Sequence, residues 1–292
     1  MGYESQREWG WPTAIEIFCG GTAGGTYIMS ALPYLIFGGR IFLPGVAASL
    51  GLMLISVFVL MAESTSLRRV SRTFSNIKSP LTVGAISLSL FIIFAIATVG
   101  IQYTGLATSV LYIIVWLGVA ISFLTIIYPG VLMSLMKAIP FWSGSGPSFL
   151  LLSAALLSGS AVVTLAGGLG KLSFSLSRVT LWGLVIYGLF LFIYMVTGGR
   201  SSKTAQISVR RLIKGNLFII FTLGVIAIGW VVPFVLYIVD IVSSSTPLLQ
   251  LGSSLILIGG VLMRYSLIAT GVRMPMLCED SITATYWLDR RG

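Results

Sequence analysis

The chain is divided by short polar segments into eight apolar runs, each long enough to cross a lipid bilayer. In the bilayer core every backbone N–H and C=O must be hydrogen-bonded internally, so apolar runs of about 20 residues form helices. We therefore expect an all-α integral membrane protein with eight transmembrane helices in two four-helix bundles, forming a single polytopic domain over residues 1–292. The expected spans are residues 13–37, 41–63, 81–103, 108–136, 147–168, 178–198, 214–240 and 248–271.

The composition excludes a water-soluble domain. Hydrophobic residues make up 57% of the chain and charged residues 9%, and so much apolar surface cannot be hidden in one core. A net charge of +10 would suggest nucleic-acid binding in a soluble protein. Here the basic residues lie in short loops between spans, where membrane topology explains them, so we expect contact with membrane lipid and no binding to nucleic acid.

The topology follows from the number of spans. Because eight is even, both termini should lie on one face of the cell membrane, here called face A, and the opposite face is called face B. Face A holds fourteen of the eighteen Lys and Arg residues, in loops, at span ends and in the two terminal segments. This bias favours a cytoplasmic face A, but basic loops that dock an acidic partner would produce the same bias. The sequence alone leaves the orientation open.

The first apolar run carries an ionisable residue, Glu16, about one turn inside its start. The segment 20–25 (GGTAGG) holds two overlapping Gly-xxx-Gly pairs, which let neighbouring helices approach closely. An ionisable residue in such a span usually faces the bundle interior and marks a functional site. Thr13 and Glu16 also have the spacing of a capping box, which stabilises a helix N-terminus. Both interpretations are left open.

Four polar residues from four different spans fall in the third of the membrane nearest face A. They are Glu16, Glu63, Tyr128 and Arg264, whereas Asp240 is the main acid near face B. Each has a structural alternative: Glu63 marks the end of a span, Tyr128 belongs to the interfacial aromatic belt, and Arg264 snorkels to face A or neutralises a carboxylate. Taken together, the four residues favour a site that opens toward face A.

The chain contains no histidine. Because haem in membrane bundles and zinc sites normally use histidine ligands, we expect no haem and no metal in this chain. A region lined by carboxylates, a phenol and apolar walls suits an amphiphile whose head exchanges protons while its tail stays in lipid, and a quinone fits that description. The electrons would then need an acceptor in another subunit on face A.

Several short motifs occur in order along nearly the whole chain, and together they resemble the NrfD-like membrane subunits of polysulfide-reductase-type complexes. The motifs are the segments 11–16 (WPTAIE), 20–25 (GGTAGG), 62–64 (AES), 78–84 (KSPLTVG), 128–132 (YPGVL), 137–142 (KAIPFW) and 259–265 (GGVLMRY).

The resemblance implies an eight-helix anchor that binds a menaquinone-type quinone. It also implies electron exchange with a ferredoxin-like iron–sulfur subunit, which serves a molybdopterin-type catalytic subunit. In relatives the quinone pocket uses the positions of Thr13, Glu16 and Tyr128, with Asn and His in place of the first two. Glu63 matches an acid proposed for proton transfer, and Arg264 is a further candidate quinone ligand.

Two questions stay open after the resemblance. Many relatives hold their catalytic subunits outside the cytoplasm, which contradicts the cytoplasmic face A that the basic loops favour. The alternative function is a secondary transporter without a redox partner, but transporter sites usually lie near the bilayer midplane. The charged groups of this chain lie toward one face, which favours the quinone site with Glu16, Tyr128 and Glu63 as its reactive residues.

Overall fold

The computed structural model describes residues 6, 9–38, 40–63, 80–105, 108–168, 176–243 and 245–273, and these residues are predominantly helical, as predicted. The elements in chain order are α1 (Trp11–Phe37), α2 (Leu43–Glu63), α4 (Pro80–Thr104), α5 (Thr108–Ser134), α6 (Gly146–Val163), η1 (Thr164–Gly168), α7 (Leu176–Ser201), α8 (Lys203–Lys214), η2 (Ile219–Val231), α9 (Val232–Ser243) and α10 (Thr246–Ala269). The two η elements are π-helical segments that continue into or from an α-helix.

Seven of the described helices are long and apolar enough to cross a membrane, so the chain is a multi-pass membrane protein. They are α2, α4, α5, α6 with η1, α7, η2 with α9, and α10. The predicted count of eight spans is therefore not confirmed. The first run forms the 27-residue helix α1, but its glycines, threonines and Glu16 make it less apolar than the other seven.

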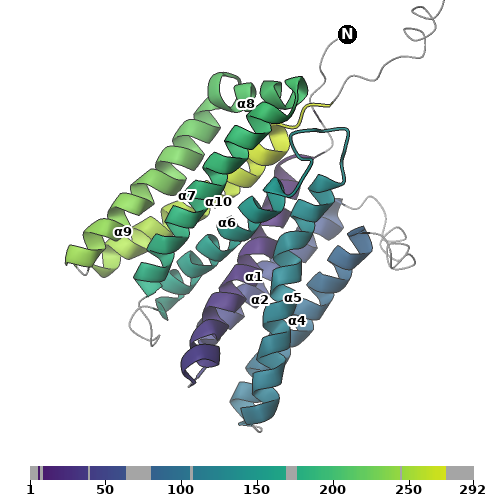
Figure 1. The fold of residues 1–292 in the computed structure, drawn as a ribbon. Coiled ribbons are helices and arrows are strands. Elements are labelled where there is room, and N and C mark those ends of the chain that lie inside the picture. The colour runs from purple at the N-terminus through teal and green to yellow at the C-terminus, as the bar shows by residue number, and fades with distance from the viewer. Residues whose placement is uncertain are drawn as a thin grey trace, which may run out of the picture.

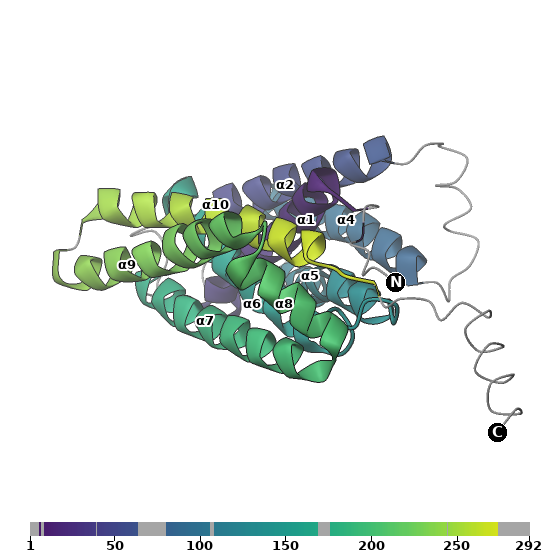
Figure 2. The ribbon, with the colours of Figure 1, turned by 90° about the horizontal axis from the view of Figure 1, so that it is seen from above.

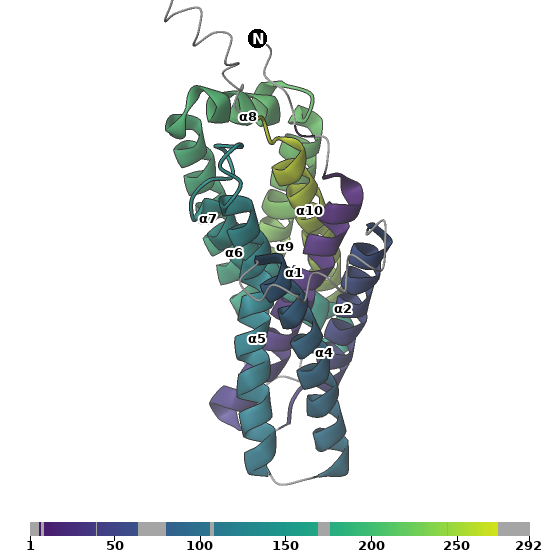
Figure 3. The same ribbon diagram turned by 90° about the vertical axis from the view of Figure 1, so that its right-hand side faces the viewer.

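Helix α1 runs through the middle of the bundle, with α6 on one side and α2, α4 and α5 on the other (Figures 1 and 3). The two overlapping glycine pairs point to these two sides. A Cβ at Gly24 would lie 2.9 Å from the Ile126 side chain on α5. A Cβ at Gly25 would overlap the carbonyl oxygen of Ala155 on α6, where Gly159 in turn meets the backbone of Gly25. The predicted close approach of neighbouring helices is thus found on both faces of α1.

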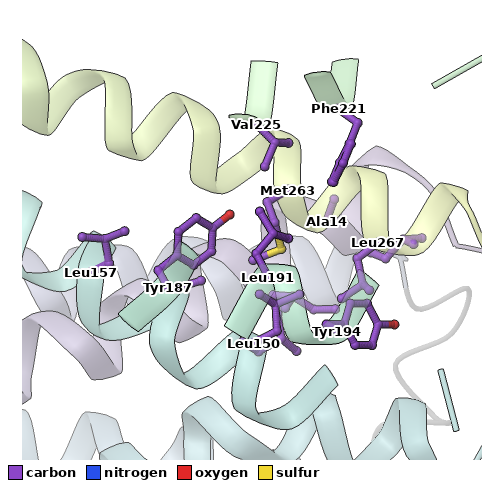
Figure 4. Close-up of a cluster of buried hydrophobic side chains, with 14 of the residues drawn as sticks. Ala14, Leu150, Leu157, Tyr187, Leu191, Tyr194, Phe221, Val225, Met263 and Leu267 are labelled. Carbon is purple, nitrogen blue, oxygen red and sulfur yellow. The ribbon is translucent and has the colours of Figure 1, made fainter. Parts of the chain in front are cut away.

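The buried apolar side chains form two main clusters. One cluster is built around α1, α2, α4 and α5, with Phe91 and Val115 at its centre. The other lies among α6, α7, η2, α9 and α10, and Figure 4 shows Tyr187, Leu191 and Met263 within it. The view from above separates the same two groups of helices, with α4 and α5 at one side and α7 and α9 at the other (Figure 2). Helices α1 and α6 contribute side chains to both clusters, and the predicted division into two four-helix bundles is not confirmed.

Residues 203–213, which lie between the predicted spans 178–198 and 214–240, form the amphipathic helix α8 together with Lys214. The Ser202 hydroxyl caps it by accepting a hydrogen bond from the Ala205 backbone N–H at 3.1 Å. Figure 3 shows α8 lying across the end of the bundle where α1 begins, above the ends of α7 and α10. A hydropathy pattern tuned to spans does not detect such a helix, because its mean hydropathy is low.

The close crossing of α1 and α6 predicts that residue 25 cannot carry a side chain without destabilising the protein. Replacing Gly25 by Ala would place a methyl group against the Ala155 carbonyl, and overpacking of this kind costs about 1–3 kcal/mol. We expect Gly25→Ala to lower the free energy of unfolding by this amount in a detergent unfolding titration. Gly51→Ala is the matched control, because Gly51 is exposed on α2 and nothing lies within 4 Å of its Cβ position. Equal stability of the two variants would contradict the close crossing.

Candidate functional site

Glu16 and Tyr128 form a hydrogen-bonded pair between α1 and α5. The Tyr128 hydroxyl donates to Glu16 Oε1 at 2.8 Å, and Glu16 is only 5% exposed. Helix α1 begins at Trp11 after the N-cap residue Gly10, without a side-chain cap. The capping-box interpretation of Thr13 and Glu16 is therefore wrong. Glu16 points into the bundle, as the alternative interpretation predicted.

Neighbouring helices determine the position of this pair. On α4, a Cβ at Gly84 would lie 2.6 Å from Cε2 of the Tyr128 ring, so only glycine leaves space for the phenol there. On α2, the Ser56 hydroxyl donates to the backbone oxygen of Glu16 at 3.0 Å and ties α1 to α2 beside the carboxylate. Gly84 ends the motif 78–84, whose first two residues lie outside the described residues. The sequence supplied this motif without showing that it makes room for Tyr128.

A second polar pair joins α1 to α2 nearer the end of the bundle. Thr13 Oγ1 donates to Glu63 Oε1 at 3.0 Å. Thr13 is half-buried, whereas Glu63 is exposed and is the last residue of α2. Glu63 thus does mark the end of a helix, but it also contacts another of the predicted site residues.

The structure does not bring Arg264 to these four residues. Its side chain is 1% exposed, and Nη1 donates to the Gly260 backbone oxygen at 2.9 Å. Its guanidinium carbon lies 5.1 Å from the centre of the Phe18 ring, a cation–π contact. Nη2 lies beside Gly21, which is five residues after Glu16 and so about 140° around the axis of α1.

This geometry decides between the interpretations of Arg264. Gly260 precedes Arg264 on α10, so the side chain points away from the face-A end of the helix and does not snorkel to it. Its hydrogen bond goes to a backbone oxygen and not to a carboxylate. Nε and Nη2 have no hydrogen-bond partner among the described residues. A role for Arg264 in binding a quinone stays a prediction without a contact to the Glu16–Tyr128 pair.

Aromatic side chains hold the start of α1 in place, and sequence reasoning assigned them no role. Trp11 stacks on Tyr265 of α10 with ring centroids 3.8 Å apart. Trp9 stacks on Trp142 at 5.4 Å, and Trp142 Nε1 donates to the backbone oxygen of Leu267 at 2.9 Å. The Trp11–Tyr265 contact joins the motifs 11–16 and 259–265, and Trp142 of the motif 137–142 contacts Trp9 and Leu267, which lie just outside those two motifs. The recurrence of tryptophan and tyrosine in all three motifs was the available signal.

Comparison with known proteins gives one family. The family model described as "Polysulphide reductase, NrfD" matches residues 2–275, which is nearly the whole chain. No curated protein matches the chain.

The hydrogen bond between Tyr128 and Glu16 can be measured in a double-mutant cycle. Tyr128→Phe and Glu16→Gln, alone and combined, should show a coupling of about 0.6 to 2 kcal/mol in unfolding titrations, the range measured for hydrogen bonds between membrane helices. Tyr27→Phe with Glu16→Gln is the control cycle, because the Tyr27 hydroxyl is bonded to Thr98 at 2.8 Å instead. Coupling no larger than in the control cycle would show that the pair does not form.

Proposed function

The chain belongs to the polysulphide reductase NrfD family, whose members are membrane subunits of oxidoreductase complexes, and on this premise we propose that it is the quinone-reactive membrane anchor of a respiratory complex. The observation that carries the proposal is the hydrogen bond between the Tyr128 hydroxyl and the buried Glu16 carboxylate. Keeping a carboxylate inside an apolar bundle costs free energy, and such residues are usually retained because they have a function. Proton exchange with a quinol head is a function of that kind.

The residues around the pair fit a quinol. A carboxylate can accept about four hydrogen bonds, and the described residues give Glu16 one side-chain hydrogen bond, from Tyr128. A quinol hydroxyl can therefore donate to the same carboxylate while the phenol of Tyr128 positions it. Tyr128 is half-buried and Trp11 is exposed, so the head can enter from the lipid side. The isoprenoid tail of a menaquinone-type quinone would then stay in the bilayer.

Thr13 and Glu63 extend this site toward the end of the bundle. Oxidation of one quinol releases two protons and two electrons. Glu16 accepts a proton from the quinol hydroxyl, and the exposed Glu63, held by Thr13 on the neighbouring helix, passes protons to water at face A. These proton transfers run in the opposite direction when the complex reduces a quinone.

The two electrons leave through another subunit. In this proposal a ferredoxin-like iron–sulfur subunit covers face A beside the start of α1, and it exchanges electrons with a molybdopterin-type catalytic subunit. The segment after α5 lies at this end of the bundle, and its exposed Lys137 and residues 143–145 are available for docking. Helix α1, although less apolar than its neighbours, acts as the eighth span of the anchor.

The first test is purification under mild detergent with the co-purifying subunits. Bound menaquinone-type quinone together with iron would support an electron-transfer anchor. In such a complex we expect Tyr128→Phe and Glu16→Gln to lower quinol oxidation, measured with a dye acceptor, by about 100-fold, because each removes a group from the proton-exchanging pair.

Two matched variants control this experiment. Tyr27→Phe removes a buried phenol hydroxyl elsewhere in the same half of the bundle, and Asp240→Asn removes a buried carboxylate from α9. Both should keep most of the activity. A protein that purifies alone, without quinone or iron, and that moves a solute in vesicles would replace the proposal with a secondary transporter.

Glu63 should affect proton release and not quinol binding. We expect Glu63→Gln to lower kcat about tenfold with little change in KM, because the exposed Glu63 lies at the exit of the site and not beside the head. Thr13→Val, which removes the hydrogen bond to Glu63 at 3.0 Å, should have the same but smaller effect. Steady-state quinol kinetics measure both parameters. A rise in KM with unchanged kcat would place Glu63 in the binding site itself.

A further inference from the structure

Helix α8 has one face fixed against the bundle. Ala205 and Leu212 are 0% and 2% exposed and belong to the second apolar cluster. The Thr270 hydroxyl, at the end of α10, donates to the backbone oxygen of Ser208 at 2.8 Å. The helix is therefore a fixed part of the fold at this end of the molecule, and its opposite face points away from the bundle.

The opposite face of α8 combines basic and apolar side chains. Lys203, Arg210 and Lys214 are exposed, and Ile207 and Ile213 lie between them. These five side chains line a groove of about 540 Å³ that continues to the end of α7. The sequence from 199 to 219 contains no Asp or Glu. The charge in the groove is therefore positive.

The groove lies where a membrane surface would meet the protein. Helix α8 crosses the bundle end at a steep angle to the spans (Figure 3), as helices in the headgroup region do. The neighbouring spans present exposed apolar side chains to the lipid, including Phe192 and Ile193 on α7 and Phe218 and Ile219 at the start of η2. The basic groups of α8 thus lie at the end of the bundle, and next to them the spans present an apolar surface suited to acyl chains.

We propose that this groove binds the phosphate headgroup of an anionic phospholipid. Lys203, Arg210 and Lys214 supply the cations, and Ile213, which is 45% exposed, contacts the glycerol and upper acyl region. An acidic protein surface would complement the cations but would leave the isoleucines without apolar partners. The spans predicted from the sequence leave residues 199–213 in a basic face-A loop expected to dock a partner subunit, and we assign their helical part this separate role instead.

Native mass spectrometry of the purified protein tests the proposal. The wild-type protein should retain phosphatidylglycerol in preference to phosphatidylcholine, and the triple variant Lys203→Gln, Arg210→Gln and Lys214→Gln should lower the apparent affinity for phosphatidylglycerol more than tenfold. The matched control replaces three exposed basic residues outside the groove and loses the same charge. It carries Arg40→Gln, Lys137→Gln and Arg178→Gln and should keep the preference.

Two further measurements separate the lipid from other ligands. Ile207→Ser with Ile213→Ser should weaken phosphatidylglycerol binding. Inorganic phosphate at low ionic strength should displace no more lipid than sodium chloride of the same ionic strength, because phosphate lacks the acyl chains. For the wild-type protein alone, high salt should abolish the preference for the anionic lipid. This salt titration decides the question even if the triple variant does not fold.

Several results would overturn the proposal. They are equal retention of both lipids by the wild type, equal loss in the control variant, more displacement by inorganic phosphate than by sodium chloride of the same ionic strength, or a groove covered by an acidic subunit in the purified complex. None of these measurements involves quinone. Failure here would leave the proposed quinone site unaffected, and loss of quinol oxidation would leave the lipid site unaffected.

Discussion

The close packing of α1 against neighbouring backbones is the contact on which the rest of the structure depends. At Gly25 and Gly159 the main chains of α1 and α6 meet with no side chain between them. Two helices approach each other more closely at glycines than at residues with larger side chains. This crossing therefore sets the distance between the two groups of helices. Everything that α1 carries, including Glu16 near its start, is positioned by that contact.

The central position of α1 also separates two kinds of polar environment. On one side, Glu16 meets the hydroxyl of Tyr128 from α5. On the other side, the guanidinium of Arg264 lies against the Phe18 ring and the Gly260 carbonyl. A buried carboxylate and a buried guanidinium usually lower their energy by pairing. Because α1 stands between them, Glu16 and Arg264 do not form an ion pair, and each has another hydrogen-bond partner.

The proposed quinone site and the proposed lipid site both lie at the face-A end of the bundle, but on different helices. The aromatic contacts of Trp9 and Trp11 hold the start of α1 beside α10. Helix α8 lies across the same end but is joined to α7 and η2, in the other group of helices. In the two proposals, a quinol would reach Glu16 from the lipid beside α1, while lipid headgroups would contact α8. The two sites are separate because α1 and α8 belong to different parts of the bundle and expose different faces.

The amino-acid sequence was sufficient to predict the class of protein, the family, and the order and approximate limits of the long helices. It also predicts the depth of each polar residue in the membrane, because each helical residue rises about 1.5 Å. Which side of each helix faces which neighbour follows only from the packed structure. Glu16 and Tyr128 meet, Arg264 lies on the far side of α1, and α8 crosses the bundle end instead of forming a loop. Direction around a helix axis depends on the packing of several helices at once, and no single run of residues contains that information.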